Sequence, residues 1–166
     1  MIIQVLGAFL GVISVSIIYG IDRKFFIYCG AGGAVGWMVY LLLGKMSHSE
    51  AFRIYCAAAV VALLAHIFAR VFKAPVTIYL IPGILPLVPG LGMYRTVYYM
   101  IEADTAMASR YFQTTMEVAG CIALAIFTMD TFFKLLFGVI LKKSVPVEKN
   151  RKIEAITVSQ DQETDK

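Results

Sequence analysis

A run of prolines and glycines interrupts the most apolar part of this chain, between residues 81 and 94. The run reads IPGILPLVPGLGMY. A proline lacks the backbone N–H and collides with the carbonyl group four residues before it, so a helix cannot pass through this run undisturbed. Unpaired backbone groups cost roughly 2–7 kcal/mol each in an apolar medium, and they persist at membrane depth only where protein or a water-filled cavity covers them. The run therefore predicts a broken membrane span and marks a candidate transport site.

The backbone of this run is itself a candidate binding surface. In a helix, its three prolines would free the carbonyl groups of Ile78, Pro82 and Leu85, which lie along one stripe. Such acceptors suit a substrate ammonium or hydroxyl group, or a coupling cation, and glycine lets a ligand approach the backbone closely. The alternative is that the prolines only shape a packed bundle. The predicted pathway residues in the run are Ile78, Pro82, Gly83, Leu85, Pro86, Pro89 and Gly90.

Four titratable residues extend this prediction. Arg95 follows the prolines, where its guanidinium could meet a substrate carboxylate in bidentate geometry or anchor the chain at the interface. His66 and Arg70 lie one helical turn apart, where they could draw an anionic substrate or take part in proton movement. Arg70 could instead reach the lipid headgroups. Glu117 is a candidate for proton coupling, unless it lies near the outer interface, where a charge costs less.

The composition places the chain among membrane proteins. Hydrophobic residues make up 60% of the sequence and charged residues 16%, and the mean hydropathy is +0.78. The 166 residues leave room for about five spans of roughly 20 residues. The predicted fold is therefore an all-α, polytopic membrane protein with about five transmembrane helices, one of them broken by proline and glycine.

We expect the five spans at about residues 2–21, 25–44, 51–72, 75–93 and 112–141. Residues 94–111 mix tyrosines with charged side chains, which is typical of an interfacial segment. In the last span, Asp130 and Lys134 are one turn apart and are expected to pair with each other. Residues 1–141 then form a transmembrane domain, and residues 142–166 form a basic, then polar, disordered cytoplasmic tail.

The positions of lysine and arginine predict the orientation in the inner membrane. The first apolar segment has no basic residues before it, so we interpret it as a retained span and not as a secretory signal. With the N-terminus outside, most basic residues face the cytoplasm, including those of the tail. The predicted inner set before the tail is Arg23, Lys24, Arg70 and Lys73, and the outer set is Lys45, Arg53, Arg95 and Arg110. The C-terminus is then cytoplasmic.

Two glycine pairs have the spacing by which transmembrane helices approach each other closely. These are Gly7 with Gly11, and Gly32 with Gly36. The second pair lies in GAGGAVGW, which fails the dinucleotide-binding pattern because Val35 takes the place of its last glycine. We therefore expect both pairs to bind other helices, in further copies of this chain or in a larger membrane subunit. Trp37, which follows, either faces a cavity or packs against lipid.

Enzyme motifs are absent from the sequence. It contains no HExxH, GxSxG or Walker motif and no carboxylate cluster with metal-ligand spacing. Cys29, Cys56 and Cys121 are isolated in apolar segments, where cysteine usually acts as a small apolar residue. We expect no enzyme activity, no cofactor and no metal site. The basic residues beside the last apolar segment indicate a membrane flank and not nucleic-acid binding.

The chain resembles the small, membrane-only subunit of the threonine/serine exporter family. The resemblance is carried by CGAGGAVGWMVYLL (29–42), KAPVTIY (73–79) and IPGILPLVPGLGMYR (81–95), and it extends over about residues 2–141. It implies secondary export of small hydrophilic metabolites, namely threonine, serine or a dicarboxylate such as succinate. It also implies a larger partner, because in this family such a unit is either half of a long exporter or a separate protein that works with a larger one.

Two other functions stay open at this point. The chain could be a non-transporting subunit that assembles or stabilises a partner holding the whole substrate path. Less expected is a membrane-embedded enzyme that acts on lipid or prenyl substrates. A flux assay with and without the partner separates the first of these from a transporter, and product formation without net flux would indicate the enzyme.

Overall fold

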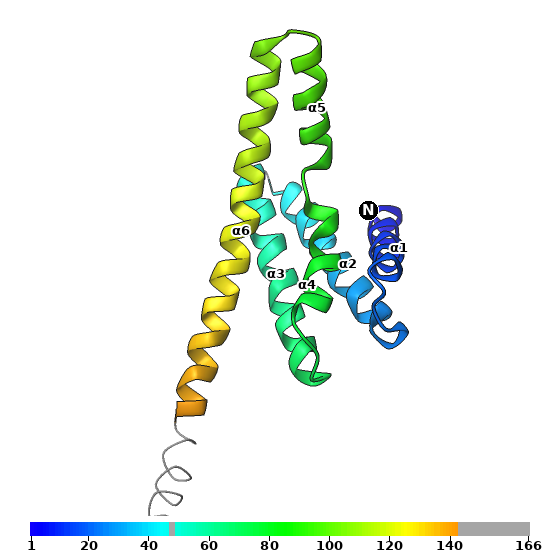
Figure 1. Cartoon of the computed structure of the whole chain (residues 1–166), viewed down its shortest axis with the longest axis vertical. Coiled ribbons are helices and arrows are strands. Elements are labelled where there is room, and N and C mark those ends of the chain that lie inside the picture. Colours follow the sequence, from blue (N-terminus) through cyan, green and yellow to red (C-terminus); the bar gives the residue numbers. More distant parts are fainter. Residues whose placement is uncertain (47–48, 143–166) are drawn as a thin grey trace, which may run out of the picture. The chain divides into compact units, whose positions relative to one another are not determined.

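The structure is a computed structural model that describes residues 1–46 and 49–142, with side chains up to Leu136. The described residues form helices and contain no strand, which confirms the all-α prediction. The predicted tail beyond Lys142 lies outside the described residues. The elements follow the chain in this order (Figure 1): α1 (Ile2–Ile18), the short 3-10 helix η1 (Arg23–Phe25), α2 (Phe26–Gly44), α3 (Glu50–Val71), α4 (Thr77–Ile84), the 3-10 helix η2 (Leu85–Leu87), α5 (Gly90–Ile101) and α6 (Thr105–Lys142).

By length and composition, three helical segments among the described residues can each cross a membrane. They are Arg23–Gly44, Glu50–Val71 and Thr105–Leu136. The bent pair Thr77–Leu87 and Gly90–Ile101 makes a fourth if it is counted as one broken span. Helix α1 is apolar but has only 17 residues, so it is shorter than the predicted first span. The predicted number of spans is therefore reached only with the bent pair and this short helix.

The chain divides into two compact units, residues 1–130 and the residues from 131 onward. Among the described residues, the second unit is the last part of α6. All contacts described below lie within the first unit.

Glycines on α2 allow three neighbouring helices to approach it closely. A Cβ built on Gly30 would lie 2.8 Å from the Phe9 ring of α1, and one on Gly36 would overlap the Val61 side chain of α3. Gly36 therefore packs inside this chain, whereas a Cβ on Gly32, Gly7 or Gly11 would meet no atom of the described residues within 4 Å. Gly36 thus has a packing partner within the same chain, and the expected contact of the glycine pair with another subunit stays a prediction.

The proline-rich run breaks the fourth span, as predicted. Pro82 lies inside α4, Pro86 lies in the first turn of η2, and Pro89 precedes the first residue of α5. Val88 is extended, and the two halves of the segment are bent by 52°. The positions of Pro86 and Pro89 suit proline, since the first residues of a helix need no N–H partner, whereas Pro82 removes an N–H group from inside α4.

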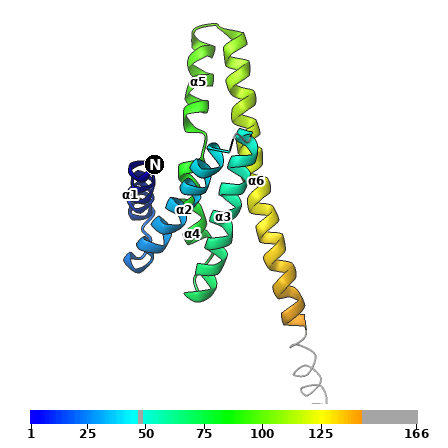
Figure 2. The same cartoon turned by 180° about the vertical axis from the view of Figure 1, so that it is seen from behind.

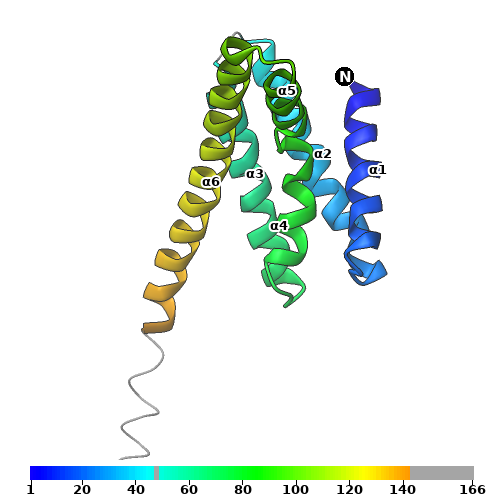
Figure 3. The same cartoon turned by 45° about the horizontal axis from the view of Figure 1, so that its top comes forward.

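Helix α5 and the first part of α6 form an antiparallel hairpin that extends beyond the ends of α2 and α3 (Figure 1, Figure 2, Figure 3). Ala103 has a φ of +60° in the turn, and Asp104 accepts a hydrogen bond from the Met107 N–H at 3.0 Å. The Tyr99 and Tyr111 rings stack with centroids 5.4 Å apart. The prediction of a separate interfacial segment over 94–111 missed this hairpin, and α6 begins at Thr105 and not near residue 112.

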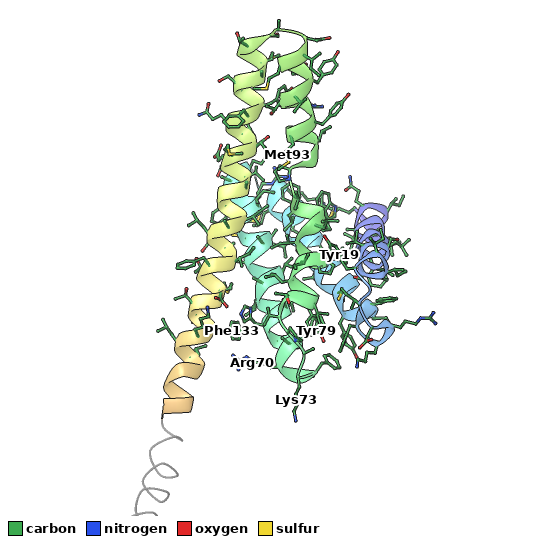
Figure 4. The ribbon with its side chains drawn as sticks, viewed as in Figure 1. Tyr19, Arg70, Lys73, Tyr79, Met93 and Phe133 are labelled. Atoms are coloured by element: carbon green, nitrogen blue, oxygen red, sulfur yellow. The ribbon has the colours of Figure 1, made fainter. Side chains whose placement is uncertain are left out.

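The basic residues of the first unit gather at two ends of the bundle. The Phe25 and Phe72 ring centroids are 6.1 Å apart, so η1 and the end of α3 lie together. Figure 4 shows Arg70 and Lys73 at this end, remote from Met93 at the start of α5. Arg53 lies at the opposite end of α3. This distribution matches the two sets from which the orientation was predicted, although the sidedness itself stays a prediction.

Candidate functional site

A cavity of about 400 Å³ lies where the broken segment meets the hairpin. Specific ligand pockets commonly have roughly 300–1,000 Å³, so this volume suits a small metabolite. Its wall comes from four regions of the chain: the end of α2, the start of α3, the break from η2 into α5, and α6. The lining residues are Trp37, Tyr40, Glu50, Ile54, Pro86, Leu87, Val88, Pro89, Gly90, Leu91, Gly92, Arg95, Tyr111, Thr114, Thr115 and Val118.

Because the fourth span is broken, the N-terminus of helix α5 lies at this cavity. The first N–H groups of a helix have no acceptor within the helix, and the helix dipole makes this end partly positive. In α5 the residues of the first turn that line the cavity are Gly90, Leu91 and Gly92, and of these the Gly90 N–H donates to the Val88 carbonyl at 2.8 Å. Arg95 follows one turn later on the same wall. A cationic side chain close to a helix N-terminus favours a carboxylate or another small anion.

An aromatic group from α2 forms a second part of the wall. The Trp37 and Tyr40 rings lie 5.2 Å apart, and the Arg53 guanidinium lies 4.3 Å from the Tyr40 ring centroid. Gly44 leaves room for Arg53, because a Cβ there would lie 3.1 Å from its guanidinium. The Trp37 Nε1 atom is buried and has no hydrogen-bond partner among the described residues. Buried donors normally have a partner, so a ligand acceptor in the cavity would satisfy this indole N–H.

Glu50 adds a carboxylate to the wall of the cavity. Its charge is opposite to that of Arg95. Glu50 lies in the first turn of α3, where the helix dipole favours a negative side chain. Among the described residues, neither Glu50 nor Arg95 has a salt-bridge partner. The cavity lining thus carries one cation and one anion, and a ligand in the cavity can meet both.

Helix α6 contributes hydroxyl groups to the same cavity. The Thr114 hydroxyl donates to the Arg110 carbonyl at 3.1 Å, and the Thr115 hydroxyl donates to the Tyr111 carbonyl at 2.7 Å. Each hydroxyl oxygen keeps lone pairs that can accept a further hydrogen bond. The Arg95 guanidinium lies 5.4 Å from the Tyr111 ring centroid, which is within the range of a cation–π contact.

The structure brings four of the predicted pathway residues together on this cavity. They are Pro86, Pro89, Gly90 and Arg95. The other predicted residues of the run do not line it. Ile78 and Pro82 line a smaller cavity of about 180 Å³ beside Tyr19. The exposed fraction of Leu85 is 41%.

The predicted stripe of vacant carbonyl groups is not present. The Ile78 carbonyl accepts from the Cys29 thiol at 3.4 Å, and the Pro82 carbonyl accepts from the Leu85 N–H. The Leu85 carbonyl accepts from the Val88 N–H at 3.1 Å. The prediction was wrong because the chain tightens into a 3-10 turn after α4, which pairs carbonyl groups that a straight helix would leave vacant.

Gly83 serves packing and not ligand approach. A Cβ at this position would lie 3.0 Å from the Val61 side chain, and the Gly33 backbone lies beyond it. The space that the sequence analysis assigned to a ligand is therefore filled by α3 and α2.

The remaining titratable candidates lie away from the cavity lining. Glu117 is exposed on α6 and Arg70 is exposed near the end of α3. His66 is buried, with 6% of its surface exposed, and its Nε2 atom lies 3.5 Å from Asp130 Oδ1. The predicted pairing of Asp130 with Lys134 stays untested. The contact of Asp130 with His66 was not predicted, because it joins residues far apart in the sequence.

Several cavity residues were missed as site residues by the sequence analysis. They are Glu50, Tyr111, Thr114 and Thr115. Glu50 and Tyr111 were visible only as charges and tyrosines that flank apolar segments, and Thr114 and Thr115 belong to no motif. A carboxylate in the first turn of a span and two adjacent threonines on the last span are weak signals without the fold. Among the described residues, no group of three or more His, Cys, Asp or Glu side chains is placed to hold a metal ion.

Comparison with known proteins supplies a family. A family model described as "Threonine/Serine exporter, ThrE" matches residues 4–132. No curated protein and no solved structure matched the chain. The matched range contains every residue that lines the cavity.

Proposed function

The chain belongs to the threonine/serine exporter family, and from this premise we propose that it exports small amino acids through the cavity at the broken span. The chain is then a membrane transporter subunit that binds a substrate such as threonine or serine without changing it chemically. Export moves the unchanged substrate across the membrane, so the site has to bind the substrate, orient it and release it.

In this proposal the ends of a zwitterionic substrate meet opposite charges. The substrate carboxylate lies at the N-terminus of α5 and pairs with Arg95, while the ammonium group pairs with Glu50. The side-chain hydroxyl of threonine or serine reaches Thr114 or the indole N–H of Trp37. Discontinuous helices that point an N-terminus at an anionic substrate group are a recurring design of secondary transporters.

The single observation that carries the proposal is the cavity at the break of the span, whose lining contains both Glu50 and Arg95. Both charged side chains line the same cavity, so a ligand that carries a carboxylate and an ammonium group can pair with each of them. A dicarboxylate would satisfy Arg95 and be repelled by Glu50. The geometry therefore favours an amino acid over a dicarboxylate such as succinate.

The proposal includes a partner and an orientation. We expect a larger membrane subunit of the same family, a further copy of this chain, or both, to complete the path. The α1 helix offers a contact surface, because side chains such as Ile3 and Leu6 are exposed there and the glycine pair beside them is open. With the N-terminus outside and the C-terminus in the cytoplasm of an inner membrane, the cavity opens toward the outer end of the bundle.

The test is transport by reconstituted vesicles that contain the full chain, with and without the larger subunit. Labelled threonine, serine and succinate are compared for the wild type, Arg95→Gln and Glu50→Gln. We expect both variants to lose threonine and serine transport at normal abundance, and Arg95→Lys to restore little because an ammonium group cannot form the bidentate pair. If Glu50→Gln improves succinate transport, Glu50 is confirmed as the residue that selects for an ammonium group.

Other outcomes separate the remaining functions. Unchanged transport by Arg95→Gln and Glu50→Gln would remove the cavity from the pathway. Transport by the larger subunit alone, at the rate of the complex, would assign this chain a role in assembly or stabilisation. A chemically altered product without net flux would indicate a membrane enzyme.

A further inference from the structure

A second polar site lies inside the first unit, away from the cavity. His66 of α3 is buried, and its Nε2 atom lies 3.5 Å from Asp130 Oδ1 of α6. Both residues belong to helical segments that are long and apolar enough to cross a membrane. An ionisable pair at such a position is costly to retain, and it commonly marks an ion or proton path.

The hydrogen bonds of His66 determine which nitrogen can take up a proton. Its Nδ1 atom lies 2.9 Å from the Ala62 carbonyl oxygen. A carbonyl oxygen only accepts hydrogen bonds, so Nδ1 carries the hydrogen in this contact. In the neutral ring the lone pair then belongs to the Nε2 atom, which lies 3.5 Å from Asp130 Oδ1. The second ring nitrogen is thus held in place as a proton acceptor beside an anion.

Asp130 also connects this pair to its surroundings. Its side chain is 41% exposed, whereas that of His66 is 7% exposed. The carboxylate is thus the more accessible partner of the pair. When Nε2 binds a proton, the new N–H can donate to Asp130, which turns a loose contact between α3 and α6 into a charge-assisted hydrogen bond.

Other charged and titratable groups lie on the helices that carry the pair and on those packed against α3. Arg70 lies one turn along α3 from His66, and Lys134 lies one turn along α6 from Asp130. The helices α2 and α4 also pack against α3, and in this half of the bundle they carry Tyr28, Cys29 and Tyr79. Arginine stays charged at every physiological pH, while histidine is the group whose charge changes near neutral pH.

The pair and the cavity share two helices. On α3, Ile54 lines the cavity and His66 lies 12 residues further along; on α6, Val118 lines it and Asp130 lies 12 residues further along. Twelve residues of helix span about 18 Å. A change in how α3 and α6 hold together at the pair can therefore reach the cavity walls along the same two helices.

We infer that His66 and Asp130 form a proton-binding site that couples proton movement to substrate export, an inference that rests on the proposed function. A hydronium ion from one side transfers its proton to Nε2, so one O–H bond breaks and one N–H bond forms. Release to the other side reverses the step and returns the neutral ring, so nothing is oxidised or reduced. The protonated pair holds α3 and α6 together, and the neutral ring lets them separate.

The test uses inverted membrane vesicles from cells that express the full chain with the larger subunit. One assay measures accumulation of labelled threonine driven by a pH gradient. The other measures exchange of labelled for unlabelled threonine without a gradient. His66→Gln and Asp130→Asn are compared with the wild type and with Ser14→Ala, a control on α1 that removes an exposed hydroxyl bonded to the Leu10 carbonyl.

We expect His66→Gln and Asp130→Asn to lose gradient-driven accumulation and to keep exchange. Asp130→Glu should keep accumulation, and Ser14→Ala should be unchanged in both assays. Accumulation at the wild-type level in His66→Gln and Asp130→Asn would overturn the inference. Loss of exchange together with accumulation would also overturn it, because the pair would then be needed for the fold or for the substrate path. If the wild type moves no threonine in either assay, the proposed function is wrong, and the inference about the coupling site is wrong with it.

Discussion

Gly92 of α5 lies directly against Thr115 of α6: a Cβ built on Gly92 would lie 2.5 Å from the Thr115 hydroxyl oxygen and 3.6 Å from its Cβ. Thr115 is buried and its hydroxyl is held by the Tyr111 carbonyl. The contact therefore fixes the base of the hairpin at the wall of the cavity.

Adding a methyl group at this contact should disturb the hairpin. We expect Gly92→Ala to destabilise the protein by about 1–3 kcal/mol, the usual cost of an extra methyl in a packed site. The double variant Gly92→Ala with Thr115→Ala should recover most of this loss, because it removes the hydroxyl that the new methyl meets. Gly90→Ala is the matched control, since a Cβ there meets nothing within 4 Å. Thermal unfolding in detergent measures all three, and equal melting temperatures for Gly92→Ala and the wild type would contradict the contact.

The indole N–H of Trp37 should contribute to substrate affinity. Trp37→Phe keeps an aromatic ring beside Tyr40 and removes the unpaired donor. A neutral hydrogen bond is worth about 0.5–1.5 kcal/mol, so the KM for threonine should rise roughly 2- to 10-fold. The maximal rate should change less than the KM. A KM equal to that of the wild type would show that the substrate does not reach the indole.

The two glycine pairs should respond differently to a large side chain. Leucine at Gly7 and Gly11 should weaken co-purification with a further copy or the larger subunit, because these positions are open in the chain itself. Leucine at Gly36 should instead lower the yield of folded protein, because it collides with Val61 inside the chain. Co-purification and detergent stability are measured for both variants. A folded Gly36→Leu protein that only loses its partner would reverse this assignment.

Labelling of introduced cysteines can test the sidedness of the bundle directly. With Cys29 changed to serine and Cys56 and Cys121 changed to alanine, single cysteines are placed at Lys73 and at Glu102. These residues lie at opposite ends of the first unit. An impermeant thiol reagent added to sealed cells should modify Glu102→Cys and leave Lys73→Cys unmodified until the membrane is opened. The reverse pattern would place the N-terminus in the cytoplasm.

The break of the fourth span was predictable from the sequence because it is set by local chemistry. Pro82, Pro86 and Pro89 remove N–H groups wherever the chain lies, so the interruption does not depend on distant residues. The fate of the vacated carbonyls was not predictable. It depends on a 3-10 turn and on the Cys29 thiol, which comes from another helix.

The cavity was predictable only in part, for a similar reason. The proline- and glycine-rich run was enough to predict four of its residues, because they are neighbours in the sequence: Pro86, Pro89, Gly90 and Arg95. Glu50, Thr114 and the contact between His66 and Asp130 depend on how α3 and α6 pack, and no pattern in a single apolar helix specifies that register. The hairpin was missed because α5 follows an apolar break and carries charges that are typical of an interface.

Substrate protection of a cavity cysteine tests the central claim, that a small amino acid binds where the broken span meets α6. Thr114→Cys places a thiol on the cavity wall in the background without native cysteines, and Met116→Cys, whose native side chain is 50% exposed and outside the lining, is the control. The rate of labelling by a methanethiosulfonate reagent is measured with increasing threonine. We predict that threonine slows labelling of Thr114→Cys in a saturable way, that Arg95→Gln abolishes this protection, and that Met116→Cys is labelled at one rate throughout. Labelling of Thr114→Cys at the same rate with and without saturating threonine would contradict the account.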